Sequence, residues 1–499
     1  MINRAGLEKF LRQSEGKMPP VFKGREDVLT TLHQAGENMR QIVDIPGHTE
    51  PQMKLEGTEK TTQIIQGAPG AGKSSVLAKL QKECMAREQE GAPRVVIVSS
   101  QSVVGSLPQV LKLIRAAGEL SSLKWKDVLS RIGVNLSANS LGAISASVSW
   151  NINDFDTPTT LDQLAERSPS QNWKAPVIVA VDEAQRISGA DNTAHARFLQ
   201  SIHDASSGLP LTLVLAGLSD TKNTANQLGI TRGITPHTIH CLDQADCMEL
   251  VTDFCHKFGV DSAGYEPELY ALAEPTEGWP RHIHFTFKAL ATELLRTDGN
   301  MATVNWKQVH DLSAQGRLSY YHHQQSDTFQ AVKPLIGAVM HDLKKGDSFK
   351  LITNRIRRYM TDEMVEDLPD YIRETSGLPR TFLSHMIHQG ALHEYEFDQF
   401  FSPIPSFRRH LIKEGIMDPT NPYPLHRTFY LYYGTEPFFS KKGFASYASA
   451  RDWACKSLER MNNEKDISLW YDDIPIEILR VAATKLSSEE DNHDYTVGV

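Results

Sequence analysis

The sequence predicts an α/β fold in which a parallel β-sheet is flanked by helices, and three segments support that prediction. The first is a short β-prone run, residues 61–66, which leads into a glycine-rich loop and then into a segment with helical apolar spacing. The other two are uninterrupted apolar runs, 176–181 and 211–217, of the kind found in strands buried on both faces of a parallel sheet. Strands that alternate with helical segments are typical of this fold class.

The glycine-rich loop has the pattern G-x-x-x-x-G-K-S and lies between the predicted strand and the predicted helix. Small residues allow the backbone to wrap closely around phosphates, while the loop N–H groups and the helix N-terminus face their negative charge. We expect Lys73 to reach the β- and γ-phosphates of a nucleotide and the Ser74 hydroxyl to bind Mg²⁺. The predicted nucleotide-binding residues are Gly67, Ala68, Pro69, Gly70, Ala71, Gly72, Lys73, Ser74 and Ser75.

An acidic pair, Asp182 and Glu183, directly follows the second apolar run. Ligands of open α/β sheets bind at the carboxyl ends of the strands, so both carboxylates should lie beside the phosphate loop. Asp182 would then hold Mg²⁺, directly or through water, and Glu183 would be the base that polarises an attacking water. The alternative is that the pair only caps the following helical segment, 184–187. The presence of the phosphate loop favours the catalytic interpretation.

Together these motifs resemble those of the AAA+ and STAND P-loop ATPases, above all the origin-recognition-type initiator branch and its prokaryotic ATPase relatives. The segment Val21 to Leu29, with an aromatic residue ahead of Gly-Arg-Glu and then an apolar pair, resembles a motif that precedes the phosphate loop in that family. Residues 20 to about 300 share the family's organisation. The resemblance implies an AAA+ core with ATP and Mg²⁺ as cofactors, and an ATPase that converts ATP and water to ADP and phosphate.

The resemblance also implies roles for residues beyond the strand 211–217. A polar residue there would act as a sensor that orients the hydrolytic water, and Ser219, Asp220 and Thr221 compete for this role. For each of them a simple turn or N-cap is the alternative. Arg232 lies in a segment that resembles the one whose arginine reaches the ATP of a neighbouring subunit. Its alternative is an ordinary solvated surface arginine.

A helical lid is predicted after the core, because amphipathic segments follow one another from Cys241 to about residue 325. Within it, the sequence Gly278 to Arg281 resembles the family's sensor-2 motif, so Arg281 is expected to contact the γ-phosphate. Pro280 would also open an ordinary helix in the absence of any such role.

Five regions are predicted along the 499 residues. Behind the lid, a helix, a strand pair and a closing helix resemble a winged-helix domain within a predominantly helical C-terminal region. The regions are an N-terminal segment at 1–60, the AAA+ P-loop core at 61–240 with an insertion at about 118–172, the lid at 241–325, a winged-helix-like domain at 326–415 and a C-terminal extension at 416–499.

Two of these regions contain segments with more specific expectations. In the insertion, alternating apolar residues at 137–150 predict a β-hairpin, and a flexible surface excursion is the alternative. In the extension, 448–461 and 474–486 are predicted to be helices.

Bulk composition excludes several classes of protein. The net charge of -9 argues against general coating of nucleic acid, which depends on an excess of Lys and Arg. No apolar stretch is long enough to cross a bilayer and no export signal is recognisable, so we expect a cytoplasmic protein without a membrane partner. The five cysteines form no C-x-x-C pair, and we expect reduced thiols and no zinc site.

The leading functional hypothesis is an ATP-hydrolysing AAA+ protein that acts as a nucleotide-controlled assembly switch. It would form an ATP-dependent homo-oligomer in a process linked to double-stranded DNA, such as transposition, replication or defence against mobile elements. The alternative is a STAND-type signalling ATPase that recruits a protein effector through residues 326–499 without binding DNA. The sequence leaves the choice between these partners open.

Overall fold

The fold divides into two compact units, the first containing residues 1–324 and the second most of the chain from residue 325 on. The computed structural model describes residues 2–13, 19–39, 62–87, 91–132, 158–169, 172–187, 194–204, 208–324, 333–343, 346–359, 378–388, 391–396, 398–404, 406–414, 417, 429–433, 436–437, 467–471 and 474–479.

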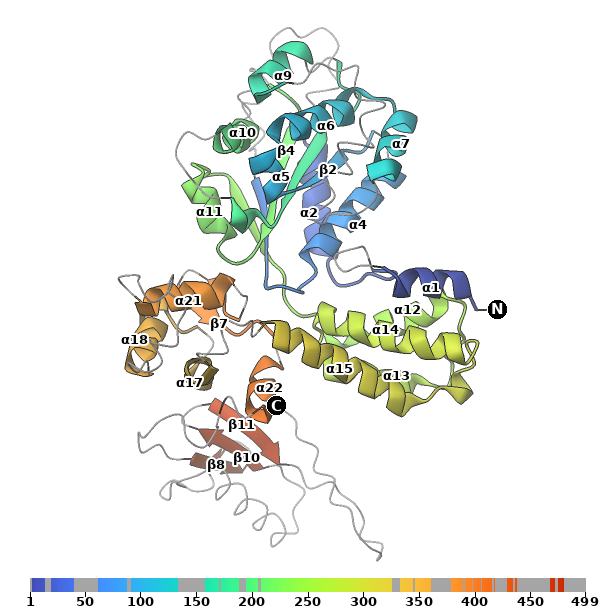
Figure 1. The fold of residues 1–499 in the computed structure, drawn as a ribbon, viewed down its shortest axis with the longest axis vertical. Coiled ribbons are helices and arrows are strands. Elements are labelled where there is room, and N and C mark those ends of the chain that lie inside the picture. The colour runs from blue at the N-terminus through green and yellow to red at the C-terminus, as the bar shows by residue number, and fades with distance from the viewer. Residues whose placement is uncertain are drawn as a thin grey trace, which may run out of the picture. The chain divides into compact units, whose positions relative to one another are not determined.

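A five-stranded parallel sheet forms the centre of the first unit (Figure 1). Its spatial order is β2-β3-β4-β1-β5, and every neighbouring pair is parallel. The register places Gln66 beside Gly217 and Asp182 beside Ser99, so the carboxyl ends of four strands lie at one edge. The strands are β1 (Thr62–Gln66), β2 (Arg94–Ser99), β3 (Val177–Asp182), β4 (Leu211–Gly217) and β5 (Ile234–Thr238).

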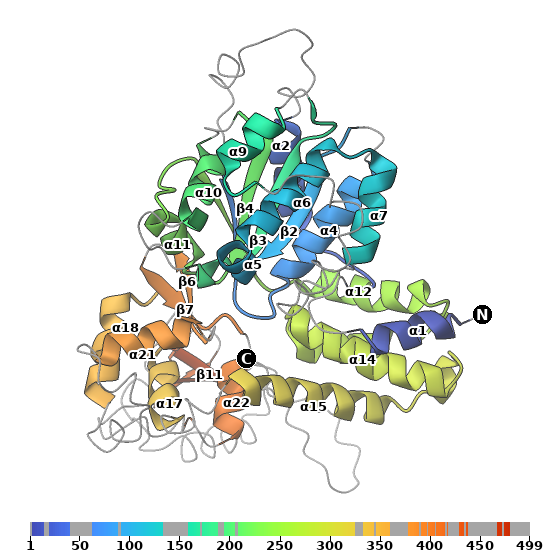
Figure 2. The ribbon, with the colours of Figure 1, turned by 45° about the horizontal axis from the view of Figure 1, so that its top comes forward.

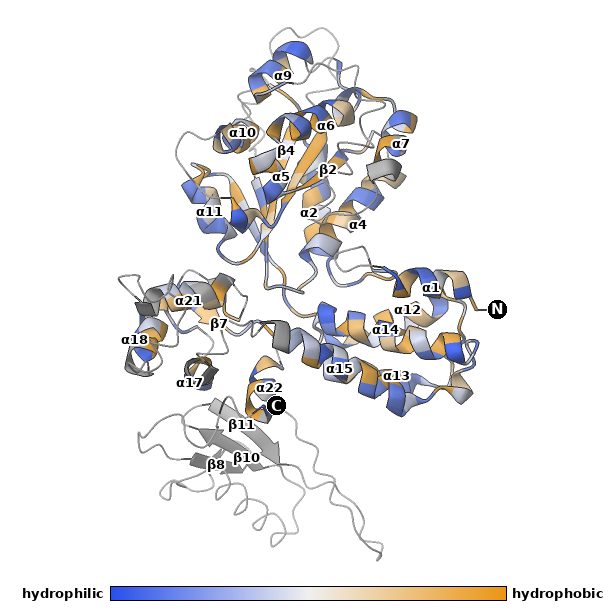
Figure 3. Cartoon of the chain, viewed as in Figure 1, coloured by the Kyte–Doolittle hydropathy of each residue, from blue (hydrophilic) through white to orange (hydrophobic). Residues whose placement is uncertain are grey.

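Helices cover both faces of this sheet, which explains why its central strands β3 and β4 are almost entirely apolar and buried (Figure 2 and Figure 3). On one face, alternate residues of β3 such as Val177 and Val179 join a cluster with helices α6 and α10. On the other, Ile178 lies against Gly36 of helix α2, where an added Cβ would be 2.6 Å from its side chain. The helices of this part are α2 (Glu26–Glu37), α4 (Lys73–Ala86), α5 (Ser100–Gly105), α6 (Leu107–Glu119), α7 (Ser122–Ile132), α9 (Leu161–Arg167), α10 (Ala194–His203) and α11 (Thr221–Gln227), with a 3-10 turn at Ala184–Arg186.

A helical lid follows β5, as predicted, and it has a hydrophobic core of its own. Helix α1 (Arg4–Leu11) joins this core through Leu7 and Phe10, although it comes first in the sequence. The described part of the 1–60 segment is therefore shared, with α1 on the lid and α2 on the sheet. The lid contains α12 (Gln244–Lys257), α13 (Glu266–Ala273), α14 (Pro280–Arg296) and α15 (Trp306–Gln324), with 3-10 turns at Glu274–Thr276 and Met301–Thr303.

The flanked parallel sheet and the helical lid confirm the predicted α/β fold. Behind the lid, a helix is followed by a two-stranded sheet and a further helix, in the order expected for residues 378–413. The elements here are α17 (Lys333–Asp342), α18 (Phe349–Tyr359), α21 (Leu378–His388), β6 (His393–Glu396), β7 (Gln399–Phe401) and α22 (Phe407–Lys413).

The C-terminal extension differs from the prediction in one described segment. Residues 474–479, expected to begin a helix, form strand β11 of a four-stranded sheet with order β11-β10-β8-β9. Isoleucine at alternate positions, Ile474, Ile476 and Ile478, has the period of a strand, and β10 pairs with this segment along one side. The strands are β8 (Phe429–Tyr433), β9 (Glu436–Pro437), β10 (Ile467–Tyr471) and β11 (Ile474–Leu479).

Two other sequence predictions, the hairpin at 137–150 and the helix at 448–461, lie outside the described residues.

Within the described part of the chain, no helix combines the length and apolarity needed to cross a membrane. Four cysteines fall in this part, namely Cys84, Cys241, Cys247 and Cys255, and all four are free thiols.

Candidate functional site

The predicted phosphate loop lies at the carboxyl edge of the sheet, between β1 and α4 (Figure 1). Gly70 and Gly72 have φ angles of +85° and +99°, in the left-handed region that glycine adopts without steric cost. Helix α4 begins at Lys73, and the amides of a helix's first turn have no acceptor within the helix. The loop therefore presents backbone donors to an anion.

The Lys73 ammonium group is held inside this loop. Its Nζ donates to the carbonyl oxygens of Gly67 at 2.6 Å and Ala68 at 3.0 Å. Burial lowers the pKa of Lys73 to about 8, and the negative charges of Asp182 and Glu183 oppose this shift. A phosphate group in the loop would supply the counter-charge that this cation lacks.

The two sequence motifs meet at Ser74 and Asp182. The Ser74 Oγ donates to Asp182 Oδ2 at 2.6 Å, although 108 positions separate the two residues. Asp182 is 7% exposed, and its Oδ1 accepts the backbone N–H of Glu183 at 3.0 Å. Adjacent hydroxyl and carboxylate oxygens are ligands of the type that Mg²⁺ prefers, so these residues fit a Mg²⁺ ion that also binds phosphates.

Glu183 has a different environment from Asp182. Its backbone is left-handed, with φ of +55°, which turns the chain sharply at the end of β3. The carboxylate is 47% exposed and forms an ion pair with Arg186 at 3.0 Å. A carboxylate next to the metal-type ligands but outside them is what a base for water activation requires.

The three sensor candidates differ in how their side chains are satisfied. Thr221 donates its hydroxyl to the Leu218 carbonyl at 2.6 Å and is fully buried, as expected for a residue that starts α11. Asp220 is the N-cap residue of that helix. Ser219 is 3% exposed, and its hydroxyl has no hydrogen-bond partner among the described residues. Because buried hydroxyls nearly always find a partner, Ser219 remains a candidate for binding a group outside the described residues.

Sequence reasoning missed Gln185, which joins the strand carrying the acidic pair to the sensor strand. Its Oε1 accepts the backbone N–H of Leu218 at 3.2 Å. Gly217 permits this approach, since an added Cβ there would lie 2.3 Å from Gln185 Oε1. The glutamine after an acidic pair has no pattern of its own that would have predicted this contact.

Arg232 lies at the amino ends of the strands, whereas the phosphate loop lies at their carboxyl ends. It is exposed and lies two residues before β5, next to Gly233, whose carbonyl oxygen accepts the Thr62 N–H at 2.7 Å. The five residues of β1 span about 16 Å from there to the loop, which exceeds the reach of an arginine side chain. Arg232 therefore does not reach a nucleotide on its own loop. Its exposed position fits both a contact with another chain and an ordinary surface arginine.

Arg281, by contrast, lies directly beside the loop. It is the second residue of α14, and a Cβ added to Gly70 would be 2.9 Å from its Cβ. Its guanidinium stacks over the Phe285 ring at 5.2 Å. The sequence prediction for Arg281 and the position observed for it are compatible.

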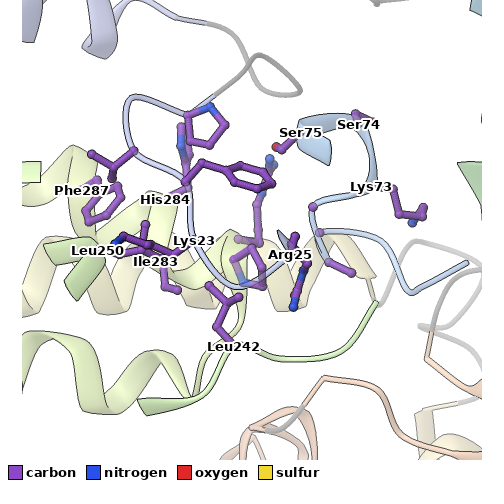
Figure 4. A pocket seen from close by; sticks show the side chains of 18 residues that line it. Lys23, Arg25, Lys73, Ser74, Ser75, Leu242, Leu250, Ile283, His284 and Phe287 are labelled. Atoms are coloured by element: carbon purple, nitrogen blue, oxygen red, sulfur yellow. The ribbon is translucent and has the colours of Figure 1, made fainter. Parts of the chain in front are cut away.

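A cavity of about 230 Å³ opens next to the loop, between the lid and the segment that precedes α2 (Figure 4). Gly70 to Ser75 and Arg281 line its polar side. The other lining residues were not predicted as site residues, although those at 21–23 and 25 belong to the motif quoted above. Most of them are apolar, and the exceptions are Lys23, Arg25 and His284. These apolar lining residues are Pro19, Val21, Phe22, Leu242, Leu250, Pro280, Ile283 and Phe287.

The Gly-Arg pair of that motif fixes one wall of the cavity. Arg25 donates to the backbone carbonyls of Gly24, at 2.9 Å, and His240, and burial lowers its pKa. An added Cβ at Gly24 would lie 2.4 Å from Asp246 Oδ2 and 2.6 Å from Leu242. The motif thus packs the segment before α2 against the connection between β5 and α12.

No protein-family model matches this chain, and no curated protein sequence matches it either. Among solved structures, it is similar to a Walker-type ATPase of Pyrococcus abyssi, with 14% identity and a TM-score of 0.44, over 81% of this chain and 99% of that chain. It is also similar to the ORC2 protein of Aeropyrum pernix, solved with ADPNP and ADP, at 12% identity and a TM-score of 0.40, over 82% of this chain and 98% of that one.

A third similar structure is Cdc6p from Pyrobaculum aerophilum, at 13% identity and a TM-score of 0.40, over 82% of this chain and 98% of that one. All three TM-scores lie below 0.5. The roles assigned to residues therefore rest on the geometry of this chain.

Proposed function

We propose that this chain binds MgATP and hydrolyses it to ADP and phosphate. The observation that supports this most directly is the 2.6 Å hydrogen bond between Ser74 and Asp182. It brings a phosphate loop and an acidic strand end to one point beside a cavity with apolar walls. Few sites other than those for a metal-bound nucleotide require this combination.

In this proposal the nucleotide lies across the loop and the cavity. The triphosphate is held by the loop amides and by Lys73, whose bonds to two carbonyls are exchanged for bonds to phosphate oxygens. The adenine base of the nucleotide enters the apolar part of the cavity, where the rings of Phe22 and Phe287 offer flat hydrophobic contact. Ser74 and Asp182 would hold Mg²⁺, which would neutralise phosphate charge.

The chemical step then depends on Glu183. Its exposed carboxylate accepts the proton of the attacking water, and Ser219 supplies the hydroxyl that orients this water. Arg281 contacts the γ-phosphate from the lid, so that lid position depends on the nucleotide.

Assembly follows from the position of Arg232. Because this residue is exposed and remote from its own loop, we propose that it contacts the nucleotide of a second copy, which makes ATP hydrolysis dependent on a homo-oligomer. Double-stranded DNA is the proposed partner of the assembly, on the strength of the sequence resemblance to initiator-type ATPases.

Two variants test the ATPase. Lys73→Ala should lose ATP binding, measured by equilibrium titration. Glu183→Gln should bind ATP within about threefold of the wild-type affinity but hydrolyse it about 100- to 10,000-fold more slowly, because only the proton acceptor is removed. The matched control, Glu166→Gln on the exposed side of α9, should leave both quantities unchanged. Full turnover by Glu183→Gln would refute the assignment of the base.

A mixing experiment tests the role of Arg232. Arg232→Ala subunits keep an intact loop and Lys73→Ala subunits keep an intact arginine, so a mixture should regain part of the ATPase activity that each lacks alone. No recovery, in a mixture shown by particle mass to co-assemble, would count against a role in trans.

The same assay with and without double-stranded DNA tests the partner. DNA should raise the ATPase rate and the particle mass. Assembly that responds to ATP but is indifferent to DNA would support the signalling alternative.

A further inference from the structure

The last helix of the lid, α15, reaches the phosphate loop through one hydrogen bond. Tyr320 Oη donates to the carbonyl oxygen of Pro69 at 2.7 Å, across 251 positions of sequence. Tyr320 is 6% exposed, and burial raises the pKa of its hydroxyl, which therefore remains protonated and able to donate.

This bond fixes a peptide plane within the loop. In a trans peptide the C=O of one residue and the N–H of the next point in opposite directions. With the Pro69 carbonyl held toward α15, the Gly70 N–H is held on the far side of that plane, away from α15. Gly70 lines the cavity beside the loop, so the orientation of its amide bears on ligand binding.

Other lid side chains crowd the same point. A Cβ added to Gly70 would lie 2.9 Å from Arg281 Cβ, 3.2 Å from Trp279 Nε1 and 3.2 Å from Tyr320 Oη. Two lid helices, α14 and α15, thus converge on a single glycine of the loop. Gly70 tolerates this approach because it has no side chain and adopts a positive φ of +85°.

We propose that Tyr320 is a positioning residue that couples the phosphate loop to α15, so that nucleotide binding and the packing of this helix depend on each other. The proposal rests on the proposed function, because it assumes that the loop binds a nucleotide. Tyr320 lies four positions before Gln324, where α15 ends, and the second compact unit begins at the next residue. Nucleotide occupancy is thereby transmitted along the lid helix that leads into the C-terminal half of the chain.

The test compares the full-length wild type with Tyr320→Phe, which keeps the ring and removes the donor. We expect ATP affinity to fall roughly 2- to 10-fold, the effect of one lost hydrogen bond to a carbonyl. Amide hydrogen exchange of α15, measured with and without MgATP, should show protection by ATP in the wild type and clearly less in Tyr320→Phe. A residue with only a packing role would alter exchange equally in both states.

Tyr321→Phe is the matched control, because it removes a hydroxyl from the neighbouring buried tyrosine on the same helix. Tyr321 and Tyr320 both pack their rings edge-on against His282, at 5.4 Å and 5.8 Å, and the hydrogen bond to Pro69 belongs to Tyr320. The Tyr321→Phe variant should keep the wild-type ATP affinity and the wild-type protection of α15 by ATP.

The outcomes separate the two proposals. A wild type that does not bind ATP refutes the proposed function. A wild type that binds ATP without any change in the exchange of α15 overturns the coupling, and this holds even where Tyr320→Phe fails to fold. Equal affinity and equal protection in wild type and Tyr320→Phe would overturn it as well.

Discussion

Replacing Gly278 by alanine should separate the lid from the core connection and weaken nucleotide binding. Gly278 has a φ of +71°, and an added Cβ would lie 1.9 Å from the backbone oxygen of Leu242. In the wild type, Leu242 N–H donates to Gly278 O at 2.8 Å, so the two backbones are in direct contact. Leu242 also lines the cavity, which links this contact to the site.

The magnitude has two parts. A left-handed backbone costs an alanine about 1–2 kcal/mol. The clash adds more, because the two backbones must separate by at least about 1 Å, which breaks their hydrogen bond and costs about 1–3 kcal/mol. We therefore expect Gly278→Ala to lower the free energy of local opening by about 2–5 kcal/mol.

Gly264 provides the control. Its φ is +84°, but an added Cβ would meet no heavy atom of the described residues within 4 Å. Gly264→Ala should therefore lose only the backbone part, about 1–2 kcal/mol, and leave ATP affinity unchanged. Native-state hydrogen exchange of α12 and α14, together with ATP titration, measures both effects. Equal costs for the two variants would refute the close contact between Gly278 and Leu242.

Three further predictions concern other parts of the first unit. Ser74→Ala should lower ATP affinity about 10- to 100-fold when Mg²⁺ is present and much less in EDTA, because the hydroxyl that is removed is a proposed ligand of Mg²⁺; equal losses under both conditions would contradict the metal role. Phe10→Ala should release α1 from the lid at a cost of about 3–5 kcal/mol, seen as faster hydrogen exchange of α1, since its ring packs 5.5 Å from that of Phe254. Acidification from pH 7 to pH 5 should lower the free energy of unfolding by about 2 kcal/mol through His282 alone, because burial lowers its pKa to about 3 and only the unfolded chain binds the proton below pH 6.5. Urea unfolding at both pH values should show this loss in the wild type and not in His282→Gln.

The phosphate loop and the acidic pair were predictable because each has a local sequence pattern. The loop at residues 67–74 and the pair at 182–183 each follow an apolar strand, and parallel strands bring their carboxyl ends to one edge. Pattern and topology together are enough to predict that Ser74 lies next to Asp182.

The contacts made by the lid were not predictable in the same way. Tyr320 meets Pro69 across most of the first unit, and nothing in the helical pattern of α15 distinguishes it from the adjacent Tyr321. The apolar walls of the cavity likewise consist of ordinary core residues whose role depends on tertiary packing. Residues 474–479 show a different failure, because their alternating isoleucines indicated a strand and were interpreted as a helix.

The position of α1 on the lid has a mechanical consequence. The backbone passes between lid and core twice, once between α1 and α2 and once between β5 and α12. Residues of both crossings, Val21 and Leu242 among them, form the walls of the cavity. A rigid body attached at two points can still rotate about the line that joins them, but it loses most other rigid-body motion. A ligand bound between the two crossings would therefore lie on the rotation axis of the lid.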